Sequence, residues 1–200
     1  MQRLSILLLA GLASAGFAQE PAPATDPLTV VVPGKRAGPV TGYSSLSILK
    51  GLFGRTKVKT GKLPGDEGET IDGAVINAGT DRELHVVWEP SAVERRIKLV
   101  RVIGRAWKFE NGLAIGLTVG ELEKINGQPF KMNGFNWDFG GYASFDGGAL
   151  ASGVSVRLKP TAGNCSPDIT GNKQVPSTST ALLAAHPLVS AIAVTFRNRP

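Results

Sequence analysis

The chain has 200 residues, a formal net charge of +6 and a hydrophobic fraction of 42%. This length and apolar content suit one domain, or two small halves that share a core. Cys165 is the only cysteine, which excludes an internal disulfide and leaves a zinc site without enough thiolate ligands.

The first eighteen residues predict export. Arg3 precedes an apolar run over residues 4–12 that is too short to span a bilayer. Small residues follow, with Gly16 and Ala18 at the positions expected before a cleavage site. We therefore expect a signal peptide over residues 1–18 and a periplasmic or secreted protein. An uncleaved N-terminal anchor is the alternative.

The next elements read as a linker and then a helix. Residues 19–38 are rich in proline and alanine, with a short strand expected at residues 28–32. Residues 45–54 have helical periodicity: Ser45 is the expected N-cap, and Gly54 ends the helix. The charged residues 55–70 contain a Pro-Gly turn, and we expect them to form a surface excursion between the helix and the sheet.

Strands are expected over residues 71–77, 83–88 and 96–103, the first two joined as a hairpin. A second helix is predicted at residues 118–126, where Thr118 and Glu121 have the spacing of a capping box. The remaining expectations are a hairpin of residues 135–145 with 149–158, a loop over 160–177, a short helix at 178–186 and a closing strand at 190–196.

These elements predict an α+β fold, an antiparallel sheet with two or three short helices on one face. The spacing of apolar residues and glycine in the first helix returns 73 residues later in the second, as in Leu49 and Leu122. A single domain over residues 39–200 could thus consist of two helix-then-strands repeats, 39–110 and 111–200. Coincidence is the alternative, because capped amphipathic helices that end in glycine are common.

Four segments carry a resemblance to an uncharacterised family of exported bacterial proteins. They are residues 42–54, Gly79-Thr-Asp-Arg-Glu-Leu-His-Val-Val-Trp88, residues 112–130 and residues 134–141. The unit Thr-x-x-Glu-Leu followed by Gly-x-Pro (residues 118–129) also resembles the strand-turn-helix unit of β-lactamase-inhibitor-protein-like domains, which include small lipoproteins of outer-membrane assembly. The chain lacks the disulfides and the lipid-bearing cysteine of those proteins, so the resemblance implies architecture and no activity.

The sequence contains no catalytic signature. There is no Gly-x-Ser-x-Gly elbow, no phosphate-binding glycine loop and no His spacing that suits a metal, so we expect no catalytic residue, metal or cofactor. Asp138, between Trp137 and Phe139, is the most interesting carboxylate, and it shares a strand face with Asn136 in the expected hairpin. A solvent-facing aspartate is the simpler interpretation.

Two sets of residues are candidates for binding. Asn136, Asp138 and Tyr142 belong to the aromatic segment, and Arg96, Lys98 and Arg101 belong to a basic strand. The leading hypothesis is an exported, non-enzymatic binding or structural module of the bacterial envelope, whose partner is an unknown protein or envelope component and not a nucleic acid. The alternatives are a small hydrolase-like enzyme with a cleft centred on Asp138 and a weak contact of the basic residues with an anionic surface.

Overall fold

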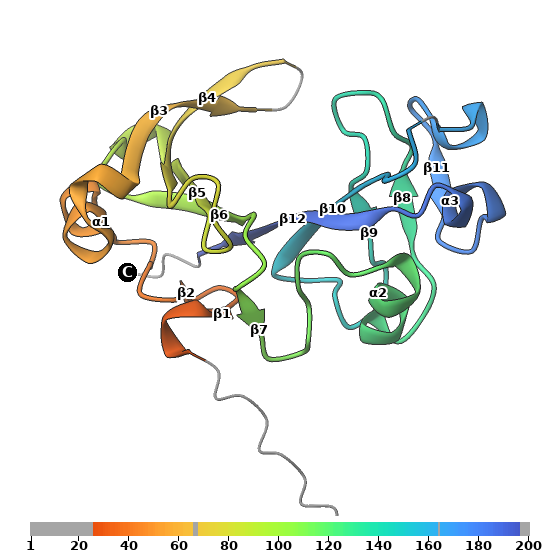
Figure 1. Cartoon of the computed structure of the whole chain (residues 1–200), viewed down its shortest axis with the longest axis horizontal. Coiled ribbons are helices and arrows are strands. Elements are labelled where there is room, and N and C mark those ends of the chain that lie inside the picture. The colour runs from red at the N-terminus through yellow and green to blue at the C-terminus, as the bar shows by residue number, and fades with distance from the viewer. Residues whose placement is uncertain (1–25, 66–67, 164, 197–200) are drawn as a thin grey trace, which may run out of the picture.

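The computed structural model describes residues 26–65, 68–163 and 165–196 (Figure 1). The expected signal peptide and most of the proline-rich part of the linker lie outside these residues. The α-helices are α1 (Leu46–Phe53), α2 (Val119–Asn126) and α3 (Thr180–Ala184). The strands form one six-stranded antiparallel sheet and two small three-stranded sheets, so the α+β class is confirmed.

The six-stranded sheet has the strand order β10-β12-β6-β5-β4-β3. Its members are, in chain order, β3 (Val58–Pro64), β4 (Thr70–Ile76), β5 (Leu84–Trp88), β6 (Ile97–Val102), β10 (Val154–Lys159) and β12 (Leu188–Thr195). The small sheets are β2-β1-β7 and β11-β8-β9. Their strands are β1 (Val30–Val32), β2 (Arg36–Ala37), β7 (Lys108–Phe109), β8 (Lys131–Asn133), β9 (Ala143–Ser144) and β11 (Gln174–Pro176).

One face of the large sheet is buried under the helices. In β6 the side chains of Val100 and Val102 are fully buried, whereas Leu99 and Arg101, which alternate with them, are only half-buried. This alternation follows from the period of two along a strand. The three helices contribute to the same core cluster as these valines, and Figure 1 shows α1 near one end of the sheet and α2 and α3 near the other.

The predicted N-cap residues of α1 and α2 are both confirmed. Ser45 accepts the backbone N–H of Ile48 at the start of α1. At α2, Thr118 and Glu121 form the complete capping box, and Gly127 ends the helix in the left-handed conformation with φ 80°. The short third helix and the closing strand are confirmed as well, as α3 and β12.

Residues 55–70 were expected to form a surface excursion between the helix and the sheet, but most of them belong to the sheet itself. Strand β3 occupies residues 58–64 and pairs with β4 from Val58–Ile76 to Pro64–Thr70. Only Val58 and Leu63 of β3 are buried, because β3 is the edge of the sheet. An edge strand accepts polar side chains, glycine and a terminal proline, so the apolar alternation that marks a strand in the sequence is absent.

The predicted hairpin of residues 135–145 with 149–158 is also wrong. β9 covers only residues 143–144 and pairs with β8, while β10 pairs with β12. Residues 134–142 form a closed loop instead: Asn136 has φ 63°, and the N–H of Gly141 donates to the carbonyl of Asn133. The expected loop over 160–177 contains β11.

The two halves of the chain share part of their order of elements. The series α1-β3-β4-β5-β6 can be aligned with α2-β8-β9-β10-β12, with β11 and α3 inserted before β12, and β6 pairs with β12 within the large sheet. The β5–β6 pair and the β10–β12 pair each contain a register shift, where Trp88 pairs with Ile97 and Leu158 pairs with Val189. The sheet therefore runs without interruption from the first half of the chain into the second, while the helix-then-strands repeat stays a prediction.

Candidate functional site on the open face of the large sheet

The face of the large sheet opposite the core cluster carries two rows of side chains. Each row crosses several strands, because directly paired residues point to the same side of a sheet. The first row is Gly73, Val87, Leu99 and Thr195. The second row is Val75, His85, Arg101, Ala193 and Ser155. We call this surface the open face.

The open face contains a small apolar cluster of its own. Leu63 and Val87 are 5% and 4% exposed, yet neither belongs to the core cluster under the helices. Gly73 lies between them, and a Cβ at this position would come within 2.3 Å of a methyl carbon of Leu63. The missing side chain of Gly73 thus lets Leu63 of the edge strand fold down against the sheet.

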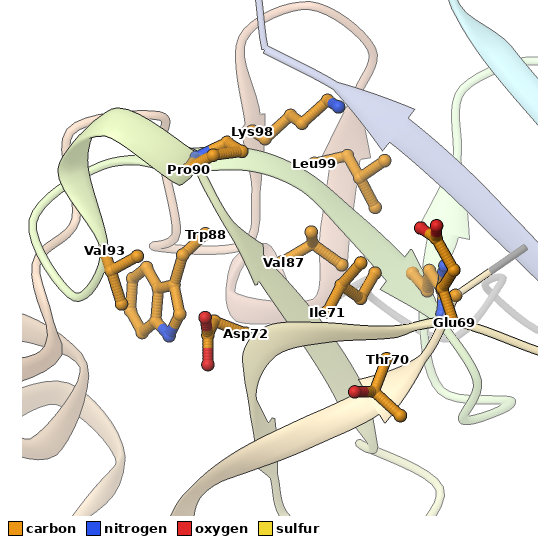
Figure 2. A pocket seen from close by; sticks show the side chains of 12 residues that line it. Glu69, Thr70, Ile71, Asp72, Val87, Trp88, Pro90, Val93, Lys98 and Leu99 are labelled. Carbon is orange, nitrogen blue, oxygen red and sulfur yellow. The ribbon is translucent and has the colours of Figure 1, made fainter.

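Two adjoining depressions lie along the open face. The first has a volume of about 460 Å³ and is lined by Ile71, Val87 and Leu99 together with polar and charged residues around them (Figure 2). The second has a volume of about 490 Å³ and reaches from Leu99 across β12 and β10 to Tyr142. Because Leu99 and Arg101 line both depressions, the two form one concave surface of predominantly apolar side chains.

Arg101 provides a positive charge in the middle of this surface. Its side chain is half-buried, and one guanidinium nitrogen donates to the carbonyl oxygen of Pro64 at 2.6 Å. Arginine has five N–H donors, so this bond leaves others for a ligand. Lys98 adds a second cation, whereas Asp72, a carboxylate of the same depression, forms a 2.9 Å ion pair with Lys62.

Aromatic side chains form the far end of the second depression. Tyr142 and Phe139 line it, and the guanidinium carbon of Arg157 lies 5.1 Å from the centre of the Tyr142 ring. Arg157 is itself held by a 2.8 Å hydrogen bond from Nε to the carbonyl of Gly140. The loop over residues 134–142, which the sequence analysis assigned to a strand, thus presents its aromatic rings beside the sheet.

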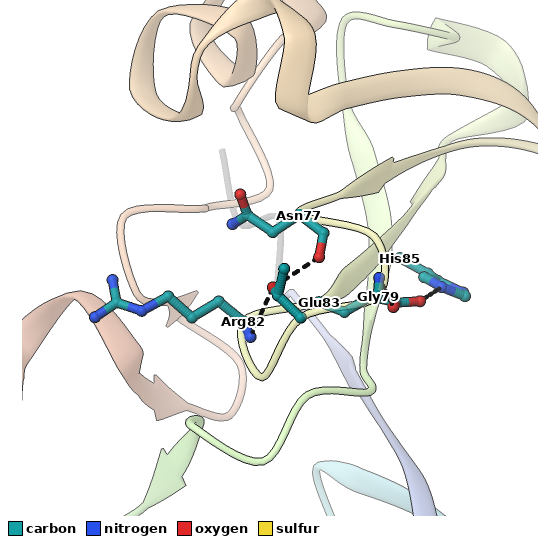
Figure 3. Close-up of polar contacts among 6 residues, drawn as sticks. Asn77, Gly79, Arg82, Glu83 and His85 are labelled. Carbon is teal, nitrogen blue, oxygen red and sulfur yellow. Dashed lines mark hydrogen bonds and ion pairs between the residues drawn. The ribbon is translucent and has the colours of Figure 1, made fainter.

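His85 has a carboxylate partner beside it. Its Nε2 lies 2.6 Å from Glu83 Oε1, and Glu83 Oε2 accepts the backbone N–H of Gly79 at 2.6 Å (Figure 3). The same turn is closed by Thr80, whose hydroxyl donates to the carbonyl of Asn77. Glu83 therefore orders the hairpin loop between β4 and β5 and fixes the imidazole.

The six residues expected to bind a ligand are divided among four places. Lys98, Arg101 and Tyr142 lie along the open face. Asn136 lines a separate depression of about 490 Å³ with Trp137 and Arg157. Asp138 is exposed in the loop, where its backbone carbonyl is 3.5 Å from Arg157, and Arg96 stacks on Tyr43 at 5.2 Å.

The apolar floor of the open face was not predicted from the sequence. Ile71, Val87 and Leu99 each lie in a strand that also contains a charged residue or a histidine, so no apolar run marks them as one surface. The pattern indicates strands without showing that one of their faces stays uncovered. The pairing register was needed to place the three side chains together.

Two further properties of the described residues concern metal ligands and membrane-spanning helices. Within residues 26–65, 68–163 and 165–196, three or more His, Cys, Asp or Glu side chains do not come together in a group that could hold a metal ion. Each helix in the same part of the chain is too short or too polar to cross a membrane.

Comparison with known proteins gives a likeness of fold and no family. No protein-family model and no curated protein matches the chain. The fold is similar to the crystal structure of the uncharacterized protein yfeY from Escherichia coli, with a TM-score of 0.47 and 13% sequence identity. The match covers 81% of this chain and 97% of that one. At this level of similarity, neither the site nor its function is inferred from that protein.

Proposed function

We propose that the protein is an exported, non-enzymatic binding module of the bacterial envelope, and that it holds a partner protein on the open face. The partner contributes an extended segment with apolar side chains and at least one carboxylate. The apolar side chains lie over Ile71, Val87 and Leu99, and the carboxylate pairs with Arg101.

A single observation carries this proposal: two adjoining depressions share Leu99 and Arg101. The combination of apolar floor and central guanidinium is typical of interface centres, where arginine and apolar anchors provide most of the binding energy. Both depressions are shallow and open along the sheet, which suits a protein segment better than an enclosed small molecule.

The alternative of a hydrolase centred on Asp138 finds no comparable support. That hypothesis needs Asp138 to meet Asn136 or His85 in a cleft. Asp138 is exposed in its loop, Asn136 lines a depression with Arg157, and His85 is held by Glu83 at 2.6 Å on β5. The binding module is therefore the better conclusion.

The proposal is tested by replacing Leu99 with glutamate and measuring the capture of envelope proteins by the purified chain. Leu183→Glu is the matched control, because Leu183 lies on α3 with 46% of its surface exposed. Leu99→Glu should weaken capture about tenfold or more, since it places a carboxylate on the apolar floor. Equal capture by Leu99→Glu and the wild-type chain would contradict the proposal, provided that both have the same circular dichroism spectrum.

A further inference from the structure

A second surface of the molecule, around α1, combines exposed apolar side chains with basic ones. Tyr43, Ile48, Leu52 and Val93 are 51%, 48%, 48% and 39% exposed, and they are four of the six large apolar side chains exposed in the described residues. Two backbone hydrogen bonds, Leu46 N–H to Glu94 and Ile97 N–H to Gly42, hold residues 42–46 against residues 94–97. We call this surface the α1 corner (Figure 1).

The α1 corner contains a basic depression. It has a volume of about 900 Å³, and its charged lining consists of Lys50, Arg55 and Arg95 with a single carboxylate, Glu94. The ion pairs found within the described residues involve none of these three cations. The depression therefore has a surplus of positive charge that is available to an anionic partner.

The basic depression and the exposed apolar side chains occupy neighbouring arcs of α1. Successive residues of an α-helix are rotated by about 100°. Leu49 and Phe53 face the core, Lys50 and Gly51 border the depression, and Ile48 and Leu52 follow beyond Gly51 on the exposed arc. An exposed apolar arc beside a basic surface is typical of elements that bind at a membrane interface.

The second helix provides an internal comparison. At the offset of 73 residues, Ile48 corresponds to Glu121 and Lys50 corresponds to Glu123. Glu121 belongs to the capping box of α2, and the equivalent fold position therefore tolerates a carboxylate. The apolar and basic character of the α1 corner is a property of this one helix and not a requirement of the repeated topology.

From these observations we infer that the α1 corner docks on the surface of an anionic phospholipid membrane. Lipid phosphates lie in the depression against Lys50, Arg55 and Arg95. Ile48 and Leu52 enter the boundary between headgroups and acyl chains, and Tyr43 lies at the headgroup level beside the Arg96 guanidinium. The two proposed surfaces meet at Val93, which lines both the basic depression and the first depression of the open face. Ile48, Lys50 and Leu52 line neither depression of the open face.

The charge requirement is tested with Gly51→Glu, which adds a carboxylate to the depression. A Cβ at Gly51 meets nothing within 4 Å, and the same holds for Gly120 in α2. Gly120→Glu is therefore a matched control with the same charge change on the other helix. Protein purified after expression of the full chain is sedimented with vesicles of phosphatidylcholine and phosphatidylglycerol in equal parts, or with vesicles of phosphatidylcholine alone.

We expect the wild-type chain to bind the mixed vesicles more tightly than the neutral ones. Gly51→Glu should weaken this binding about fivefold, the usual effect of one charge near an anionic surface, whereas Gly120→Glu and Gly51→Ala bind like the wild type. Equal binding to both kinds of vesicle, or equal losses for Gly51→Glu and Gly120→Glu, would overturn the inference. If the apolar residues 4–12 stay attached to the purified protein, they should increase binding to both kinds of vesicle. The difference in binding between the mixed and the neutral vesicles can still be measured.

The apolar requirement separates a membrane from a soluble polyanion. The double variant Ile48→Ser/Leu52→Ser should lose vesicle binding and still bind inorganic polyphosphate like the wild type, because its basic residues are intact. Vesicle binding that survives in the double variant would show a purely electrostatic contact and overturn the membrane assignment.

Discussion

At the scale of single residues, Asn126 is the polar side chain on which the second half of the core depends most clearly. It is 2% exposed at the end of α2. Its Nδ2 donates to the carbonyl of Gln128 at 3.0 Å, and its Oδ1 accepts the N–H of Leu150 at 3.2 Å. Gly148 packs against this amide so closely that a Cβ would lie 2.0 Å from Oδ1.

Asn126→Ala should therefore destabilise the protein by about 1–3 kcal/mol, because the backbone N–H of buried Leu150 loses its acceptor and the carbonyl of Gln128 loses its donor. Urea unfolding measures the change, with the exposed Asn172→Ala as control. Equal stability of the two variants would show that the Asn126 bridge is dispensable.

Asn126 also shows which part of the core could not be predicted from the sequence. The apolar face of α2 was predicted from Val119, Leu122 and Ile125, and the core does contain the first two. A buried asparagine at the end of a helix has no periodic signal, and one of its two partners, Leu150, lies 24 positions away along the chain. The open face was not predicted as a site for a similar reason. Its residues lie on several strands, and their neighbours on the surface are distant in the sequence.

At the scale of elements, the capping box of α2 predicts a pH dependence. The backbone N–H of Thr118 and then its hydroxyl, each 2.8 Å from Glu121 Oε2, lower the pKa of the Glu121 carboxyl from its ordinary value of 4.5. A depressed pKa in the folded state means that the ionised form adds stability above the ordinary pKa, and that this stability is lost as the pH falls through the lowered value.

Melting temperatures measured from neutral to acidic pH test this effect. Wild-type stability should decline more steeply than that of Glu121→Gln once the pH falls below about 4.5. Glu110→Gln, in the exposed turn after β7, is the control and should follow the wild type. Parallel acid profiles for Glu121→Gln and the wild type would mean that the carboxylate contributes nothing to the cap.

Elements with local signals were predictable, and elements without them were not. The caps and terminal glycines of α1 and α2 depend on residues that are close together in the sequence. The same is true of the loop between β4 and β5. β3 was missed because an edge strand has no apolar alternation, and the loop over residues 134–142 was taken for a strand because its rings are spaced like one. In that loop, Trp137 Nε1 instead donates to the carbonyl of Gly134, which holds the chain in a turn.

At the scale of the whole molecule, the pairing of β6 with β12 creates the surface on which the proposed function depends. Leu99 and Arg101 of β6 lie beside Thr195 and Ala193 of β12, so the open face draws on both halves of the chain. The helices occupy the other face and leave this one uncovered. The repeat could be suspected from the sequence, whereas the joint surface depends on a pairing between strands some ninety residues apart.

The most direct test of binding on the open face is site-specific photo-crosslinking in bacterial cells that express the full chain. A photoreactive amino acid replaces Thr195, which is exposed on β12 and lines the second depression, or Thr80, which is exposed in the turn between β4 and β5. We predict a discrete crosslinked partner at position 195 and none at position 80. Crosslinks at position 80 without any at position 195 would contradict the assignment of the open face as the binding surface.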